Sequence, residues 1–230
     1  MKHMPIPDNI AKLLNRVRFA AQKSQRNAED ICVVAASKTR SSDTIRSAYH
    51  SGLRDFGENY LQEALDKIEA LTDLNLCWHF IGPIQSNKTR PIAEHFSWVH
   101  SVERLKIARR LSDQRPPELG PLQILLQVNI SGEASKSGAL PEELPLLVTE
   151  IRELPRITLR GLMAIPAAAN DESQKSQPFA HMHQLLQEMQ VIAPEMDSLS
   201  MGMSNDLEAA IAQGATFVRV GTAIFGPRNG

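Results

Sequence analysis

Two kinds of segment alternate along the chain, distinguished by their pattern of apolar and polar positions. Short apolar runs, typical of strands buried on both faces, occur about eight times. Between them lie amphipathic stretches with the period of a helix, several of them bounded by Ser, Gly or Pro. The predicted strands cover residues 31–37, 54–57, 77–81, 97–100, 122–130, 157–165, 197–200 and 216–220. The predicted helices cover residues 8–24, 42–51, 60–71, 87–95, 103–112, 141–154 and 206–213, with one more between a polar loop at 170–177 and Pro194.

This alternation predicts an α/β fold. About eight strand–helix units in 230 residues have the size and order of a single (β/α)8 TIM barrel, here with an extra N-terminal helix at residues 8–24. A doubly wound open sheet would produce the same pattern, because periodicity does not show whether a sheet closes. The chain contains no repeat of fixed period and no low-complexity linker. We therefore expect residues 1–230 to form one domain.

Composition narrows the class of protein. Hydrophobic residues make up 42% of the chain, charged residues 22%, and the formal net charge is −1, so no basic field favours nucleic acid or an anionic membrane. No apolar stretch has the length of a spanning helix or of a signal peptide core. Cys32 and Cys77 lie in strand-like runs, which favours reduced thiols in a cytoplasmic protein over the alternative of a single buried disulfide. Two cysteines and scattered histidines have no zinc-site spacing, so no metal site is predicted.

Lys38 directly follows the first predicted strand. A lysine beside such an apolar run is costly to bury unless it is paired, neutralised or covalently bound. At the mouth of a barrel, an amine with a lowered pKa is able to attack an aldehyde and form a Schiff base. An ordinary strand-end lysine, with a packed stem and a hydrated ammonium, accounts for the same position. Lys38 alone does not decide between the two interpretations.

The segments after the seventh and eighth predicted strands carry anion-binding features. The first contains Gly202 and Ser204, and the second contains Gly221 and Thr222. Glycines allow backbone N–H groups to approach an oxyanion closely, and the hydroxyls add donors. Phosphate sites of TIM barrels commonly form from these two loops, so the segments predict a phosphate site. Taken singly, Ser204 is also explained as a helix N-cap and the glycines as turn residues.

Other polar residues have two interpretations each. Arg219 lies in an apolar strand and needs a partner, either a carboxylate such as Asp55 or Glu58 or an acceptor on a ligand. His79 ends the third strand and is most simply a hydrogen-bonded core histidine. Lys136 belongs to a polar loop and is either solvated or in contact with a second ligand phosphate. A strand-end amine together with a phosphate site suggests pyridoxal phosphate (PLP) or a sugar-phosphate aldehyde as ligand.

Several motifs together resemble those of a known family, the small pyridoxal phosphate homeostasis proteins, also called the proline synthetase co-transcribed family. The fold of that family is similar to the N-terminal barrel of alanine racemase. The resemblance covers nearly the whole chain. The matching motifs are ASKT at 36–39, FGENY at 56–60, HFIG at 79–82, QSNK at 85–88, GLMAI at 161–165, SMGMS at 200–204 and VRVGTAIFG at 218–226.

The resemblance implies a PLP-binding site in which Lys38 carries the cofactor as an internal aldimine. It also implies that Ser204, Gly221 and Thr222 hold the phosphate and that Arg219 faces the pyridine nitrogen. Asn59 and His79 are expected to line the ring. The predicted cofactor-binding residues are Lys38, Asn59, His79, Met163, Ser204, Arg219, Gly221 and Thr222.

The resemblance leaves a carrier and an enzyme to be distinguished. A cation facing the ring nitrogen disfavours its protonation and weakens the cofactor as an electron sink, although alanine racemases tolerate this arrangement. Those enzymes also use a second domain and a partner subunit to supply an acid/base residue, and few residues follow the eighth strand here. We therefore expect a cytoplasmic, monomeric protein that holds PLP and passes it to PLP-accepting apoenzymes without efficient catalysis. A PLP-dependent racemase-like enzyme and a lysine-dependent aldolase are the alternatives.

Overall fold

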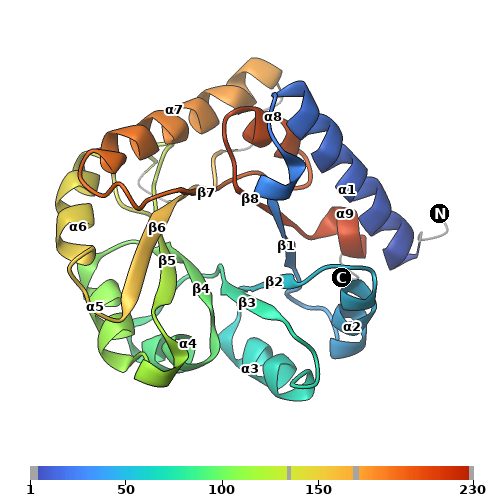
Figure 1. The fold of residues 1–230 in the computed structure, drawn as a ribbon, viewed down its shortest axis with the longest axis horizontal. Helices are drawn as coiled ribbons and strands as arrows, with labels where there is room; N and C mark the ends of the chain where they lie inside the picture. Colours follow the sequence, from blue (N-terminus) through green and yellow to red (C-terminus); the bar gives the residue numbers. More distant parts are fainter. Residues whose placement is uncertain (1–4, 134–135, 168–170, 228–230) are drawn as a thin grey trace.

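The computed structural model describes residues 5–133, 136–167 and 171–227, which contain a closed barrel of eight parallel strands. Each strand pairs with the next one along the chain, and β8 pairs with β1. Figure 1 shows the helices arranged around the strands. The (β/α)8 prediction is therefore confirmed, and the open sheet is excluded. That residues 1–230 form one domain stays a prediction.

Every predicted strand overlaps an observed one, although several bounds shift by a few residues. The strands are β1 (Cys32–Ala36), β2 (Asp55–Glu58), β3 (Cys77–Phe80), β4 (Trp98–Val102), β5 (Leu122–Gln127), β6 (Ile157–Met163), β7 (Ser198–Ser200) and β8 (Phe217–Val220). The helices are α1 (Ile6–Lys23), α2 (Ser42–His50), α3 (Leu61–Ala70), α4 (Thr89–His95), α5 (Leu105–Gln114), α6 (Leu144–Ile151), α7 (Glu172–Gln190), α8 (Leu207–Ala212) and α9 (Thr222–Phe225).

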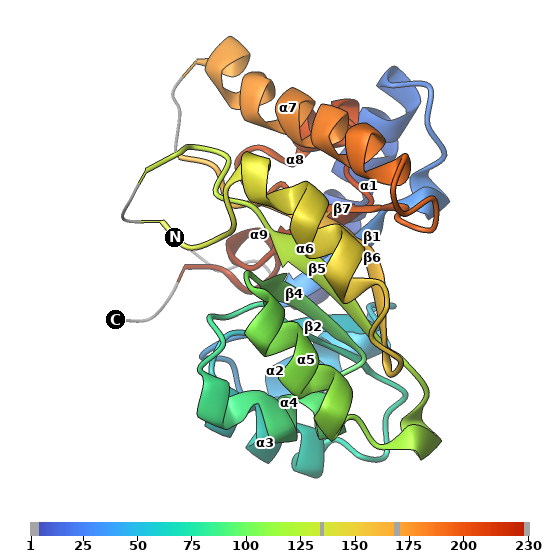
Figure 2. The same ribbon diagram turned by 90° about the vertical axis from the view of Figure 1, so that its left-hand side faces the viewer.

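The predicted polar loop at 170–177 is wrong over most of its length. Helix α7 begins at Glu172 and continues through Pro178, and residue 170 lies outside the described part of the chain. The first buried apolar side chain of α7 is Phe179, so its first two turns carry no apolar stripe that a periodicity argument detects. Figure 2 shows α7 beside α6, with α5 on the other side of α6, on the outside of the barrel.

The core lies between the barrel and its helices. Strand residues alternate, so that Val33 and Ala35 point outward into this core, whereas Val34 is buried but lies apart from it, inside the barrel. The same alternation places Phe217 and Arg219 of β8 inside the barrel. The inside of the barrel is therefore partly polar.

The extra helix α1 packs against α8 and α9 (Figure 1). Asn9 donates a hydrogen bond to the carbonyl of Ile224 at 2.9 Å, and Arg16 donates to the carbonyl of Ser204 at 3.0 Å. Arg16 also forms two hydrogen bonds with Glu208 of α8. Helix α1 thus supports, from outside, the two loops that follow β7 and β8. In the described segments, no helix combines the length and apolarity needed to cross a membrane.

Candidate functional site

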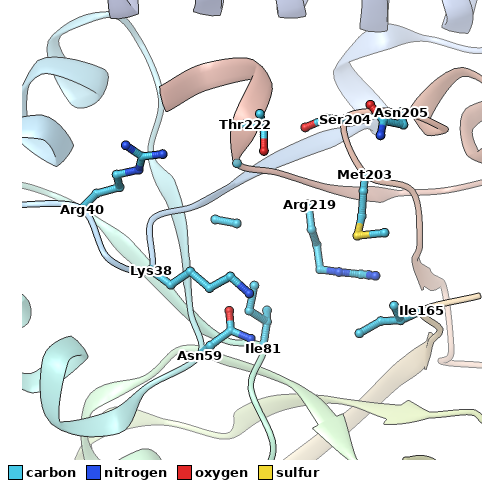
Figure 3. A pocket seen from close by; sticks show the side chains of 12 residues that line it. Lys38, Arg40, Asn59, Ile81, Ile165, Met203, Ser204, Asn205, Arg219 and Thr222 are labelled. Carbon is cyan, nitrogen blue, oxygen red and sulfur yellow. The ribbon is translucent and has the colours of Figure 1, made fainter. Parts of the chain in front are cut away.

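A cavity of about 290 Å³ opens at the C-terminal ends of the strands (Figure 3). Lys38 extends into it from the end of β1, next to Asn59 and Ile81, and Ser204 and Thr222 lie on the opposite wall. The lining residues are Ala36, Lys38, Arg40, Asn59, Ile81, Ile165, Met203, Ser204, Asn205, Arg219, Gly221 and Thr222. The structure therefore brings together six predicted site residues, namely Lys38, Asn59, Ser204, Arg219, Gly221 and Thr222.

The turn that carries Lys38 is strained. Thr39, the next residue, has a φ of +63°, which is unfavourable for a β-branched side chain. The backbone N–H of Arg40 closes the turn by donating to the carbonyl of Ser37 at 3.0 Å. The N–H of Thr39 donates to Oε1 of Glu63 at 2.5 Å. Such a conformation persists only where surrounding contacts hold it, so the support for this turn is part of the site.

A buried lysine on α3 supplies that support. Lys67 Nζ donates to the carbonyl of Ser37 at 2.8 Å, to Oε1 of Glu58 at 2.8 Å and to Oε1 of Glu63 at 2.5 Å. The Ser37 hydroxyl donates to the same oxygen of Glu58 at 2.6 Å. Burial raises the pKa of Glu58 and outweighs the opposing effect of Lys67 and Ser37. Nothing in the pattern of the chain pointed to Lys67 as the partner of Glu58.

The loop after β7 needs a glycine at position 202. Gly202 has a φ of +94°, and a Cβ added there would lie 2.6 Å from Cβ of Ala210. Close packing against α8 thus explains this glycine without a ligand. Ser204 is not the N-cap of α8, because that position belongs to Asp206, whose carboxylate accepts from the N–H of Met203 at 2.5 Å. The Ser204 side chain therefore does not cap α8.

The loops after β7 and β8 are joined to each other and to β1. Ser204 Oγ accepts a hydrogen bond from the N–H of Ala223 at 3.3 Å. A Cβ on Gly221 would lie 3.2 Å from the carbonyl oxygen of Ala36, so β8 approaches β1 closely where the loop begins. The hydroxyls of Ser204 and Thr222 consequently share one wall of the cavity (Figure 3).

Arg219 reaches the cavity from inside the barrel. Its Nη1 donates to Oγ of Ser200 at 2.6 Å and its Nη2 donates to the carbonyl of Ala164 at 2.8 Å. Burial lowers the pKa of its guanidinium to about 10, so the group stays charged near neutral pH. The ion pair considered with Asp55 or Glu58 is wrong, since Asp55 bonds to His79 and Glu58 to Lys67.

A chain of hydrogen bonds nevertheless connects Arg219 to Asp55. Ser200 Oγ lies 2.8 Å from Nδ1 of His100, His100 Nε2 lies 3.0 Å from Nδ1 of His79, and His79 Nε2 lies 2.8 Å from Oδ1 of Asp55. The pKa of His100 is far below its ordinary value because the ring is buried and close to His79 and Arg219. With both rings neutral and Asp55 ionised, every donor points toward Asp55. We call this chain of hydrogen bonds the relay. It crosses the inside of the barrel from the Arg219 cation to the Asp55 anion.

Two predicted residues do not line the cavity. His79 is fully buried, and its ring stacks on Trp98 with centroids 6.0 Å apart and planes 10° apart. It is the hydrogen-bonded core histidine that the residues alone favoured, and it forms one step of the relay. Met163 is fully buried at the end of β6. Lys136 also lies elsewhere and pairs with Glu133 at 3.1 Å.

Six residues that line the cavity were not predicted from the sequence. They are Ala36, Arg40, Ile81, Ile165, Met203 and Asn205. Most follow or lie beside residues that were identified, so the rule that sites gather at strand ends would have found them if extended along each loop. Arg40 donates to the carbonyl of Gly226 at 2.7 Å and thereby links the turn at Lys38 to the end of α9.

Comparison with known proteins adds to this geometry. Residues 9–229 match the family model described as alanine racemase, N-terminal domain. A pyridoxal phosphate homeostasis protein of Pseudomonas aeruginosa is 58% identical over 224 residues, which cover 97% of this chain and 96% of that protein. PipY of Synechococcus elongatus, solved with PLP bound, is 35% identical with a TM-score of 0.84 and covers 96% of this chain and 100% of that one.

A more distant likeness concerns the fold alone. Alanine racemase of Clostridium difficile has a TM-score of 0.74 at 14% identity, covering 97% of this chain and 58% of that chain. The barrel and its order of strands are thus shared with a larger enzyme, and the likeness at this identity carries no statement about activity.

Proposed function

Because the chain belongs to the alanine racemase N-terminal domain family and, within it, to the pyridoxal phosphate homeostasis proteins, we propose that it binds pyridoxal 5'-phosphate and takes part in PLP homeostasis. The observation that carries the proposal is the cavity at the C-terminal ends of the strands. Lys38 enters it from one side, and the hydroxyls of Ser204 and Thr222 lie across from it (Figure 3). An amine and an anion-binding wall in one cavity suit a phosphorylated aldehyde.

The donors and acceptors of the cavity fit this ligand. The hydroxyls of Ser204 and Thr222 and the backbone at Gly221 offer donors to a phosphate. The Arg219 guanidinium is a donor suited to a ring nitrogen. Asn59 Oδ1 is buried and, among the described residues, has no hydrogen-bond partner, so it is able to accept a hydrogen bond from a ligand hydroxyl. We propose these five residues and Lys38 as the cofactor contacts, with His79 and Met163 buried behind them.

The finer proposal is covalent attachment through Lys38. When bound, the cofactor supplies an aldehyde that condenses with amines. Lys38 Nζ would form a bond to the aldehyde carbon, and the aldehyde oxygen would leave as water. Lys67 holds the carbonyl of Ser37 and Glu63 holds the N–H of Thr39, so the backbone is fixed on both sides of Lys38.

We propose further that the protein is a carrier without efficient turnover. Racemisation needs a second proton donor or acceptor on the other face of the substrate carbon. Among the described residues that line the cavity, none is an aspartate, glutamate, histidine, cysteine or tyrosine. Lys38 is the one lysine of this described lining, and it has no second acid/base residue of these types across from it. The two arginines are poor proton donors because the guanidinium stays charged. A racemase-like activity is the competing function, and the shared fold is what favours it.

We propose that the protein acts in the cytoplasm as a monomer and passes PLP to PLP-accepting apoenzymes. The free thiols of Cys32 and Cys77 support a reducing compartment.

Purified protein incubated with PLP and then dialysed tests binding and function together. We expect a yellow protein with about one PLP per chain, transfer of PLP to an added PLP-dependent apoenzyme, and no racemisation of alanine or lysine. Lys38→Ala should lose the retained PLP, whereas Lys106→Ala, at an exposed position on α5, should keep it. Equal retention by both variants would contradict the site. Steady racemisation that disappears in Lys38→Ala would contradict the carrier function.

A further inference from the structure

A second cluster of reactive side chains lies at the opposite end of the barrel. Asp55 is the first residue of β2 and Cys77 the first of β3, and His79 follows two residues later on β3. One ligand atom from each of these three residues lies within 4.8 Å of the other two. Asp55 and Cys77 are register partners of the parallel pair, and His79 shares the face of Cys77. Strand pairing itself therefore assembles the cluster.

We propose that Asp55, Cys77 and His79 form a binding site for one zinc ion. A carboxylate, a thiolate and an imidazole are donors that this borderline-soft ion accepts together. Magnesium and calcium prefer sites made of oxygen ligands, so the thiol and the imidazole disfavour them. Three protein ligands leave a fourth tetrahedral position open to water.

The geometry needs only a small adjustment to admit the ion. His79 Nε2 and Asp55 Oδ1 are 2.8 Å apart, and a tetrahedral zinc with bonds of about 2.1 Å separates its ligand atoms by about 3.4 Å. The side chain of Asp55 is 28% exposed and has room to move, whereas His79 is fully buried. Asp55 is thus the ligand that shifts, and its exposure gives the ion a path from solvent.

The second nitrogen of His79 is already held. His100 Nε2 lies 3.0 Å from His79 Nδ1, and the Trp98 ring stacks on the imidazole. Partners of this kind orient a metal-binding histidine and leave its other nitrogen for the metal. With zinc on Nε2, the neutral ring takes the Nδ1–H tautomer and donates to His100, and His100 then donates to Ser200, whose oxygen has lone pairs for both His100 and Arg219. Cys77 loses its thiol proton to solvent.

Cys32 lies beside the cluster on β1. Cys32 is not one of the three residues whose ligand atoms lie within 4.8 Å of one another, so we assign it a supporting role rather than that of a ligand. Strands β1 and β3 flank β2, so two strand spacings separate Cys32 from Cys77, which is more than a disulfide spans. The pair is therefore not a redox switch. Cys32→Ser removes the neighbouring thiol and leaves all three proposed ligands in place, which makes it a matched control.

The test uses PLP-free full-length protein treated with a chelator, then loaded with Zn²⁺ and desalted. We expect elemental analysis to find one zinc per chain in the wild type and in Cys32→Ser. Asp55→Asn and Cys77→Ser should bind zinc at least tenfold more weakly, and His95→Gln, which removes an exposed histidine on α4, should bind it normally. Circular dichroism checks that each variant is folded. Wild-type zinc content no higher than that of Cys77→Ser would overturn the proposal.

Cobalt provides a second measurement, which reports directly whether the thiolate of Cys77 is bound to the metal. Co²⁺ in place of zinc should give a near-ultraviolet thiolate-to-cobalt band in the wild type and in Cys32→Ser. The band should be absent in Cys77→Ser. Absence of the band from wild-type protein, or its survival in Cys77→Ser, would refute the assigned ligands. Neither measurement involves PLP, so the outcome is separate from that of the proposed function.

Discussion

The two ends of the barrel present polar groups in different ways. At the C-terminal end, most of the cavity residues, including Lys38 and Ser204, lie on loops that follow the strands. At the other end, Asp55, Cys77 and His79 lie on the strands themselves. Loop positions depend on contacts from outside the barrel, such as those of Lys67, whereas strand positions are fixed by register. We therefore expect substitutions of supporting residues such as Lys67 to displace the cavity residues more than comparable substitutions displace Asp55, Cys77 and His79.

The relay from Arg219 to Asp55 joins these ends through the interior. Its members are buried except for Asp55, and four hydrogen bonds connect a cation to an anion. This arrangement explains how an arginine occupies an otherwise apolar strand without a carboxylate in direct contact. Ser200, His100 and His79 therefore connect the two ends of the barrel, although they do not line the cavity.

The largest expected effect is that of Lys67→Met. Removing one partner of a buried ion pair leaves Glu58 uncompensated, so the free energy of unfolding should fall by about 3–5 kcal/mol. PLP retention should fall as well, because the strained turn at Thr39 loses its support. Urea denaturation gives the stability, and dialysis followed by absorbance gives the retention.

Two further variants sharpen this prediction. The double variant Lys67→Met/Glu58→Gln should recover part of the lost stability, since no buried charge remains unpaired. Lys106→Met, on an exposed face, should change stability by less than about 0.5 kcal/mol. If the double variant is less stable than the single one, the ion pair is not the reason for the loss.

Gly202→Ala should have the next largest effect. The added Cβ meets Ala210 at 2.6 Å in a positive-φ backbone, and both costs together should lower stability by about 3 kcal/mol. Gly52→Ala is the control, because Gly52 has a similar φ of +102° but nothing within 4 Å of an added Cβ, and should cost about 1 kcal/mol. Thermal or urea unfolding compares the two. Equal losses would show that packing behind the loop after β7 contributes nothing.

Asp55→Asn tests whether the two ends act independently. Asparagine still accepts the hydrogen bond from His79, and the lost charge is partly exposed and therefore screened. We expect the PLP affinity, measured by absorbance titration, to change less than about threefold. A change of tenfold or more would show that the charge of Asp55 is felt at the cavity through the relay.

The smallest expected effect concerns Arg16 and Glu208. Burial acts to raise the pKa of Glu208, but the hydrogen bonds from Arg16 outweigh it, and the pKa lies below its ordinary value. A lowered carboxyl pKa contributes stability above the unfolded pKa, and this contribution is lost as the pH falls through the folded pKa. Because the pair is partly exposed, the contribution should be about 0.5 kcal/mol at pH 7 and vanish toward about pH 3.

Unfolding of the wild type and of Glu208→Gln across this pH range is the measurement. The difference in stability between them should shrink on acidification. A difference that stays constant from pH 7 to pH 3 would assign the effect to packing rather than to charge.

The sequence predicted the barrel well because buried parallel strands are continuous apolar runs. It predicted the position of Lys38 and of the loops after β7 and β8 because both follow from where strands end. The residues alone favoured a hydrogen-bonded core histidine at position 79, as the structure has it, and only the family resemblance placed His79 at the ring. Lys67 was missed because its contacts depend on how α3 packs.

The cluster at Asp55 was missed for a related reason. Metal-site spacing rules describe ligands close together in one segment, and here one ligand lies on β2 and two on β3. Only the pairing of Asp55 with Cys77 brings them together. Register between neighbouring strands is a tertiary property that periodicity along one strand does not contain.

Reduction of the PLP-loaded protein with borohydride, followed by peptide mass spectrometry, tests the central claim most directly. The account predicts one pyridoxyl group per chain, located on the peptide that contains Lys38 and absent from Lys38→Ala. A pyridoxyl group on a different lysine, or none in protein that retains PLP, would contradict it.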